Sequence, residues 1–291
     1  MGPSHSREQR RLQRRHRQQQ GTEGETPQTH MSEISGSIAG PSTPATGISR
    51  RSTAAESLSD TAIDTPILTT ALSYVSNRLL QKTKEHHTFI VTGDVLFSLF
   101  FRSKRATRAV ELLQTSALSA KQKEVLVSGV LKATEKYGIT RDGWVNNAGE
   151  LAMRRFDMRS SDMEEVVTRS FAQKEIVFSG DGMTLLAVDF MYELRKMLHL
   201  LSKEMDGGEG AGSEEGPDAV DLSDMVELVR RLVSVEGRGR SLRRRAVEER
   251  YEKLVFSDHA WRVLGEEYER RFGEKGLRDG DDGSTSEVRD R

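Results

Sequence analysis

The run Gly182–Leu201 is the longest well-patterned apolar stretch in the chain and constrains the fold more than any other segment. Glu193, Arg195 and Lys196 fall off its apolar face. We therefore expect a central helix with Leu194 in the core and Lys196 at a tolerant surface position. Apolar residues recur along the run at spacings of three and four, as on one face of an α-helix: Met183, Leu186, Phe190, Leu194, Met197, Leu198 and Leu201.

Other segments supply helical partners for this run. Asp64 can cap a helix whose first turn contains Pro66, and Ser119 with Gln122 forms a capping box that opens a helix ending at Gly138. Helical spacing of apolar residues predicts further helices at 92–100, 105–115, 139–156, 161–171, 225–237 and 257–272.

Two short segments favour β structure instead. Residues 88–91 and 175–178 are rich in β-branched and aromatic side chains, and they could pair with each other beside the helices. The predicted fold class is mainly α: a multi-helix domain with at most two short β segments, flanked by disordered termini.

Composition shifts suggest the domain organisation. Residues 1–62 form a basic Ser/Gly/Gln-rich tail with too few large apolar side chains to offset the entropy of ordering, so we expect disorder there. A helical core domain at 63–205 should follow, then an acidic Gly-rich linker at 206–219 and a C-terminal helical module at 220–273. Residues 274–291 are predicted to be a second disordered tail.

Composition also excludes several classes of function. The chain has no cysteine, which excludes disulfides, zinc–thiolate sites and thiol nucleophiles. Its net charge of -1 gives no global attraction to nucleic acid or acidic lipid. No apolar run is long enough to span a bilayer or to act as a secretory signal, so we expect an intracellular protein of the cytoplasm or nucleus, with no transmembrane segment and no membrane-surface association.

The sequence contains no motif that indicates catalysis. It lacks a phosphate loop, a dinucleotide-binding glycine fingerprint and a serine nucleophile elbow. His86 and His87 are adjacent, so their side chains diverge, and His199 has no evident partner in the sequence. We therefore expect no enzymatic activity, and we nominate no catalytic, cofactor-binding or metal-binding residue.

Two arginine clusters are the candidate binding residues for phosphate or for a partner. The N-terminal cluster suits a nuclear-import signal, a phosphate-binding arm, a membrane-surface anchor or a merely solvated tail. The second cluster is followed by glutamates that can neutralise it, through pairs such as Arg244 with Glu248 and Arg245 with Glu249. The candidates are Arg10, Arg11, Arg14, Arg15 and Arg17 in the first cluster, and Arg238, Arg240, Arg243, Arg244 and Arg245 in the second.

These observations favour a non-enzymatic helical protein that binds other proteins, its own copies included. The alternative is a nucleic-acid-associated structural protein, of a viral capsid type or a replication-accessory type, whose arginine clusters contact phosphate. That alternative requires charges that converge on one face of the folded chain.

Overall fold

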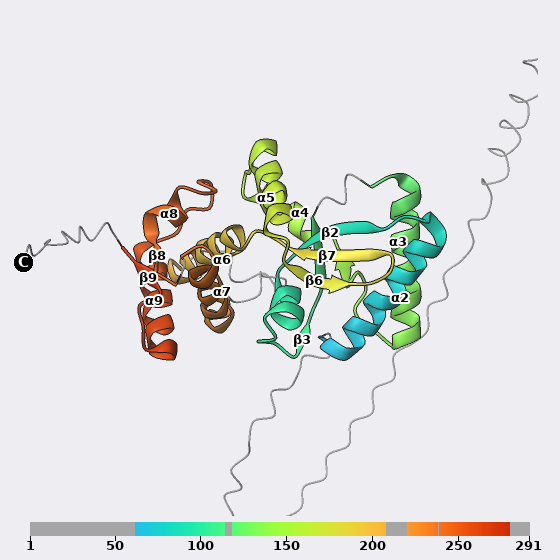
Figure 1. Ribbon diagram of the computed structural model, residues 1–291, viewed down its shortest axis with the longest axis horizontal. Helices are drawn as coiled ribbons and strands as arrows, with labels where there is room; N and C mark the ends of the chain where they lie inside the picture. Colours follow the sequence, from blue (N-terminus) through green and yellow to red (C-terminus); the bar gives the residue numbers. More distant parts are fainter. Residues whose placement is uncertain (1–61, 114–117, 208–219, 238, 280–291) are drawn as a thin grey trace, which may run out of the picture. The chain divides into compact units, whose positions relative to one another are not determined.

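The computed structural model describes residues 62–113, 118–207, 220–237 and 239–279 (Figure 1). These residues form a mixed α/β fold with nine helices, one five-stranded sheet and two small two-stranded sheets. The predicted mainly α class with at most two β segments is therefore wrong. The predicted disordered tail at 1–62, apart from its last residue, lies outside the described residues, as does most of the predicted linker.

The large sheet has the strand order β5-β4-β2-β7-β6. Its central strand, β2 (His87–Thr92), runs parallel to the neighbouring β7 (Met183–Ala187). Outside them, β4 (Val110–Leu113) is antiparallel to β2, and β6 (Ile176–Ser179) is antiparallel to β7. The fifth strand, β5 (Val145–Asn146), pairs in parallel with β4.

Each of the small sheets joins two short strands that are distant in sequence. In the first, β1 (Ile63–Asp64) pairs with β3 (Ala106–Thr107) in antiparallel fashion. In the second, β8 (Leu242–Arg243) runs parallel to β9 (Leu277–Arg278), which ties the last described residues to the segment that precedes α8.

The predicted central helix is really a strand followed by a helix. Residues 183–187 form β7, the chain turns at Val188 and Asp189, and helix α6 (Phe190–Met205) follows. The strand lies between two others and buries Met183, Leu185 and Leu186. A strand that is covered on both faces has an almost continuous apolar sequence, which fits a helical spacing equally well.

Two other predicted helices contain strands. The segment predicted as a helix at 105–115 forms β3 and β4, and the first half of 139–156 contains β5 ahead of helix α4 (Ala148–Arg155). The β-prone segments are confirmed as β2 and β6. Their predicted pairing with each other is wrong, because β7 lies between them.

Helices with strong end signals are confirmed. They include α2 (Thr65–Thr83) with proline in its first turn, and α3 (Ala120–Tyr137) with both bonds of the Ser119–Gln122 capping box. Gly138 ends α3 with a φ of 64°, a conformation that glycine adopts without strain. The other helices near predicted positions are η1 (Leu96–Phe100), α5 (Ser160–Gln173), α7 (Leu222–Val235) and α9 (Asp258–Phe272). The short α8 (Arg244–Glu248) completes the set.

The first nine residues of helix α6, Phe190–Leu198, are all buried. Its apolar residues Phe190, Leu194 and Leu198 belong to the core, and it contacts α7 and α9 (Figure 1). Glu193 and Lys196, expected on other faces, are only 1% and 9% exposed because they contact the end of β2. The interpretation of Lys196 as a tolerant surface position is therefore wrong.

Arg195 faces the other side of α6 and holds the segment that precedes α9. Its guanidinium donates to the carbonyl oxygens of Val247 and Leu254, both at 2.8 Å, and to those of Glu248 and Arg250. Burial lowers the pKa of Arg195, although Glu248 acts against this shift. A single buried arginine thus satisfies carbonyl groups at the C-terminal end of α8 and in the segment that follows it.

Candidate protein-binding groove

A groove of about 600 Å³ lies between α3, β5 and α4. Its volume is in the range typical of pockets that bind ligands or peptide segments. The wall formed by α3 is mostly apolar, whereas polar and charged side chains predominate along residues 142–154. The apolar residues used below are Leu126, Val127, Val130, Leu131 and Val145.

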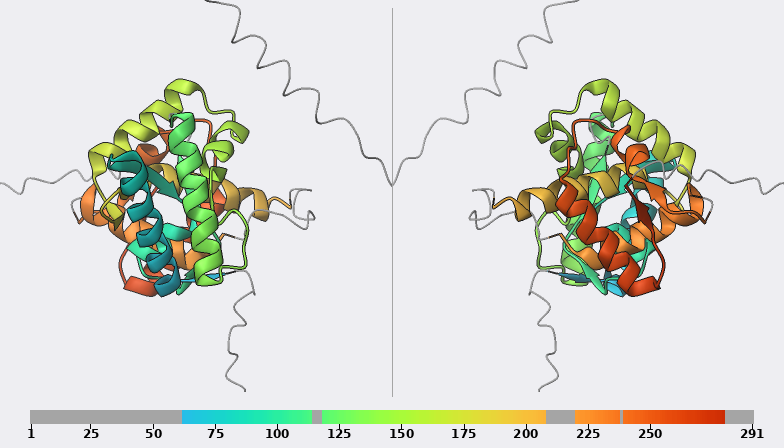
Figure 2. Two further views of the ribbon diagram at one scale, coloured as in Figure 1. Left: turned by 90° about the vertical axis from the view of Figure 1, so that its right-hand side faces the viewer. Right: turned by 90° about the vertical axis from the view of Figure 1, so that its left-hand side faces the viewer.

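The wall formed by α3 carries two exposed apolar side chains. Val127 is 58% exposed and Leu131, one turn later, is 61% exposed. The core-facing side of α3 is occupied by Leu126 and Val130, which are nearly fully buried. Val127 and Leu131 lie one position further round the helix, at the border of the groove. Figure 2 shows, in its left view, α3 beside α2 in the foreground.

Side-chain hydrogen bonds hold the opposite wall. Trp144 is fully buried, and its Nε1 donates to Thr134 Oγ1 at 2.9 Å. Asn146 holds the turn before α4, because its side chain donates to Gly143 O at 3.0 Å and accepts from Ala148 N at 2.9 Å. These bonds tie the segment 143–148 to α3 and to the start of α4.

Gly149 allows α4 to approach the sheet at the far end of the groove. A Cβ atom at this position would lie 2.5 Å from Thr92 Cγ2 and 2.9 Å from Leu113 Cδ2. Any larger residue would push α4 away from the sheet. The width of the groove therefore depends on this glycine.

The charged residues of the groove have both signs. Lys123 and Asp142 line it, and Glu150 is held by Arg154 at 2.9 Å on the same helix. A wall of mixed sign does not select a strongly acidic or strongly basic partner. Recognition in the groove is therefore expected to depend on apolar contact.

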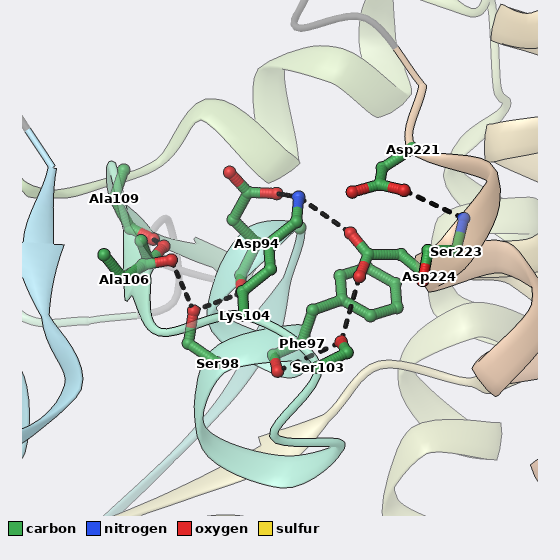
Figure 3. Close-up of polar contacts among 12 residues, drawn as sticks. Asp94, Phe97, Ser98, Ser103, Lys104, Ala106, Ala109, Asp221, Ser223 and Asp224 are labelled. Carbon is green, nitrogen blue, oxygen red and sulfur yellow. Dashed lines mark hydrogen bonds and ion pairs between the residues drawn. The ribbon is translucent and has the colours of Figure 1, made fainter. Parts of the chain in front are cut away.

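A polar cluster outside the groove links the segment after β2 with α7 (Figure 3). Lys104 Nζ lies 2.7 Å from Asp94 Oδ1 and 2.7 Å from Asp224 Oδ2, and Ser103 Oγ donates to Asp224 Oδ1 at 2.9 Å. Burial raises the pKa of Asp224, although Lys104 acts to lower it. Burial alone would lower the pKa of Lys104, but hydrogen bonds to Asp224 and Asp94 raise it overall. These contacts fix α7 beside η1.

Replacing Lys104 by methionine is expected to lower the free energy of unfolding by about 1–3 kcal/mol, because Asp224 stays buried without its counter-ion. The raised pKa of Lys104 means that its contribution is complete below the ordinary value of 10.5 and is lost as pH rises through the folded-state value. The difference from the wild type in chemical denaturation should therefore shrink in strongly alkaline solution. A Lys104→Met variant as stable as the wild type at neutral pH would contradict this role.

Another buried group of ionisable residues surrounds Thr92. Lys196 Nζ lies 2.7 Å from Glu193 Oε1 and donates to Thr92 Oγ1 at 2.8 Å, while Thr92 donates to Glu193 Oε2 at 2.5 Å. Burial raises the pKa of the nearby Glu111, and Lys196 acts against that shift. Lys196, Glu193 and Thr92 thus satisfy one another's charges and hydrogen bonds inside the protein, as expected of a structural network.

Six of the ten sequence-predicted binding residues lie outside the described part of the chain. The four described arginines stand on or near β8 and α8, where Arg240, Arg243 and Arg245 are exposed. The residues outside the described ranges are Arg10, Arg11, Arg14, Arg15, Arg17 and Arg238.

The predicted neutralisation within the second cluster is confirmed. Arg244 Nε lies 2.7 Å from Glu248 Oε1, and Arg245 Nε lies 2.8 Å from Glu249 Oε1. Arg244 also pairs with Asp258 at 2.7 Å. Burial acts to lower the pKa of Arg244, but its hydrogen bonds to Glu248 and Asp258 raise it overall. These two arginines are therefore engaged within the chain.

The groove was not identified from the sequence, although α3 carried a signal. Core packing uses Leu126, Val130 and Ala133, which already cover one face of the helix. Val127 and Leu131 add apolar surface outside that face. An apolar arc that is wider than a single core-facing stripe could have indicated a second contact surface.

The described residues thus form a mixed α/β fold with a groove of mixed lining between α3, β5 and α4. Residues 61–275, most of the chain, match a family described as a domain of unknown function (DUF7582). The chain therefore belongs to this family. No curated protein and no solved structure matches it.

The described ranges contain neither a membrane-crossing helix nor a metal-holding group of acidic and histidine side chains. None of their helices has the length and apolar character needed to cross a lipid bilayer. Within the same residues, no group of three or more histidine, aspartate or glutamate side chains is arranged to hold a metal ion.

Proposed function

We propose that this protein is a non-enzymatic binding protein that docks a helix of a protein partner against α3 and the adjoining groove. The observation that carries the proposal is the exposure of Val127 and Leu131, one turn apart, at the edge of a groove of about 600 Å³. Exposed apolar side chains that adjoin an apolar groove are typical of protein-interaction sites.

The spacing of the exposed residues suits a helical partner. An amphipathic helix presents side chains at intervals of three and four residues, and these can pack beside Val127 and Leu131 and enter the groove. The rigid wall around Trp144 supports this mode, because a preformed site loses little conformational freedom when it binds. The mixed charges at the rim favour a partner with both signs of charge beside its apolar face.

Photo-crosslinking from Leu131 tests the proposal. A photoreactive amino acid placed at position 131 of the full chain is expected to give covalent adducts with protein in cells. The matched control is the same group at Val255, which is 66% exposed but lies outside the groove. Adding Val127→Gln should reduce the adducts from position 131 several-fold.

Two outcomes would contradict this function. One is the absence of protein adducts from position 131. The other is the same adducts, in the same yield, from positions 131 and 255, which would indicate random collision. Capture of RNA or DNA in place of protein would favour the nucleic-acid alternative.

The described residues give that alternative little support. Nucleic-acid binding needs cationic side chains that converge on phosphate, whereas Arg244 and Arg245 are paired with carboxylates of the same chain. We therefore do not propose it as a second function.

A further inference from the structure

We propose that the helix docked on α3 is the α3 of a second copy of this chain, in antiparallel orientation. This inference rests on the proposed function and names the partner. A symmetric dimer requires one surface that is complementary to itself when rotated by 180°. The outer face of α3 has this property in both its charges and its apolar residues.

The charges of α3 are arranged symmetrically about Ser128. Four residues before it stands Glu124, and four residues after it stands Lys132. Seven residues before it stands Lys121, and seven after it stands Glu135. An antiparallel pair of helices centred on Ser128 therefore sets Glu124 against Lys132 of the second copy, and Lys121 against its Glu135. Each contact occurs twice by symmetry.

These four charged side chains are available for a partner. All of them are exposed, and none forms an ion pair with another residue of the described ranges. The positions at intervals of three, four and seven residues place them on the same side of the helix as Ser128. Ser128 itself is small, and its hydroxyl accepts a hydrogen bond from Arg78 of α2 at 3.2 Å, so Arg78 borders the crossing point.

The apolar residues complete the surface on the side that faces the groove. The 180° rotation that relates the two copies places the groove-facing flank of one α3 beside the groove-facing flank of the other. Val127 of one copy then lies about two helical positions from Leu131 of the other along the shared axis, or about 3 Å. Four apolar side chains, two from each copy, gather beside the groove and cover one another.

The same pattern disfavours other arrangements. A parallel symmetric pair would set each charged residue against its own copy, Glu124 against Glu124 and Lys132 against Lys132, which is repulsive. In an antiparallel pair that crosses one helical turn away from Ser128, Glu124 would no longer face Lys132 and Lys121 would no longer face Glu135. Because one helix pair covers less area than a standard stable interface, the dimer should be weak and depend on protein concentration.

Charge reversal in the full chain tests the inference. Sedimentation equilibrium over a concentration series should detect a reversible wild-type dimer. Glu124→Lys and Lys132→Glu should each weaken it about tenfold, because each converts two attractive contacts into repulsive ones. The double variant Glu124→Lys/Lys132→Glu should regain the wild-type dissociation constant. An equimolar mixture of the two single variants should also associate, because opposite charges then face each other across the interface.

Glu266→Lys is the matched control, since it reverses an exposed charge on α9 and should leave the dissociation constant unchanged. Thermal unfolding of every variant should match the wild type, because all the substituted side chains are exposed. A wild-type chain that stays monomeric at every concentration would overturn the inference. So would single variants that dimerise as well as the wild type.

Failure of the dimer inference can be distinguished from failure of the proposed protein-binding function. A monomeric chain whose position 131 still crosslinks to a different protein would refute the second copy as partner and leave protein binding intact. A monomeric chain with no protein adducts from position 131 would refute both.

Discussion

Replacing Lys196 by methionine is expected to lower the free energy of unfolding by about 3–5 kcal/mol, as measured by chemical denaturation. The loss arises because Glu193, which is 1% exposed, would remain buried without the cation that lies 2.7 Å from it. Thr92 and the backbone N–H of Gly93 also contact Glu193, but neither supplies a charge.

Two further variants isolate the buried ion pair. Lys203→Met removes an exposed lysine from the same helix and should change stability by less than about 0.5 kcal/mol. The double variant Glu193→Leu/Lys196→Met should recover part of the loss, because it removes both charges together. A Lys196→Met variant no less stable than the Lys203→Met control would show that the pair is dispensable.

Leu194→Ala is expected to cost about 2–5 kcal/mol, the range typical of a leucine truncated in a packed core. Leu194 has no exposed surface and belongs to the cluster that joins α6 with the sheet and with α7 and α9. The control is Leu131→Ala on α3, since Leu131 is 61% exposed and its truncation leaves no cavity. Equal losses for the two leucines in chemical denaturation would mean that α6 is not the packed centre of the fold.

The sequence predicts best those elements whose ends are specified locally. Ser119, Gln122 and Gly138 define both ends of α3 through contacts within a few residues, and Ser257 caps α9 by accepting from Ala260 N at 3.2 Å. Such signals depend on neighbours in the chain alone. These helix-end signals therefore hold independently of how the rest of the chain folds.

The strands depend on partners that are distant in sequence. The segment 183–187 has residues that satisfy helical spacing, and no proline or glycine separates it from α6. Its pairing with β2 decides the outcome, and nothing near residue 183 in the sequence reports that partner. The same reason explains the error at β4, whose antiparallel neighbour is also β2.

The candidate groove was beyond sequence reasoning for a related cause. It forms where α3 meets the turn held by Asn146 and the closely packed α4, whose approach depends on Gly149. The pattern of charges alone predicts binding by arginines, two of which are engaged in ion pairs within the chain. Only the folded structure shows which arginines are paired, since Arg245 is exposed and still pairs with Glu249.

The parallel pairing of β2 with β7 has a consequence for how the chain is made. His87 pairs with Met183, which is synthesised 96 residues later. At typical translation rates this delay is about 5–20 s, during which one edge of β2 has no partner from β7. The nascent chain must therefore keep an apolar strand from aggregating until the second half of the sheet emerges from the ribosome, so molecular chaperones that bind extended apolar segments have a defined period in which to act.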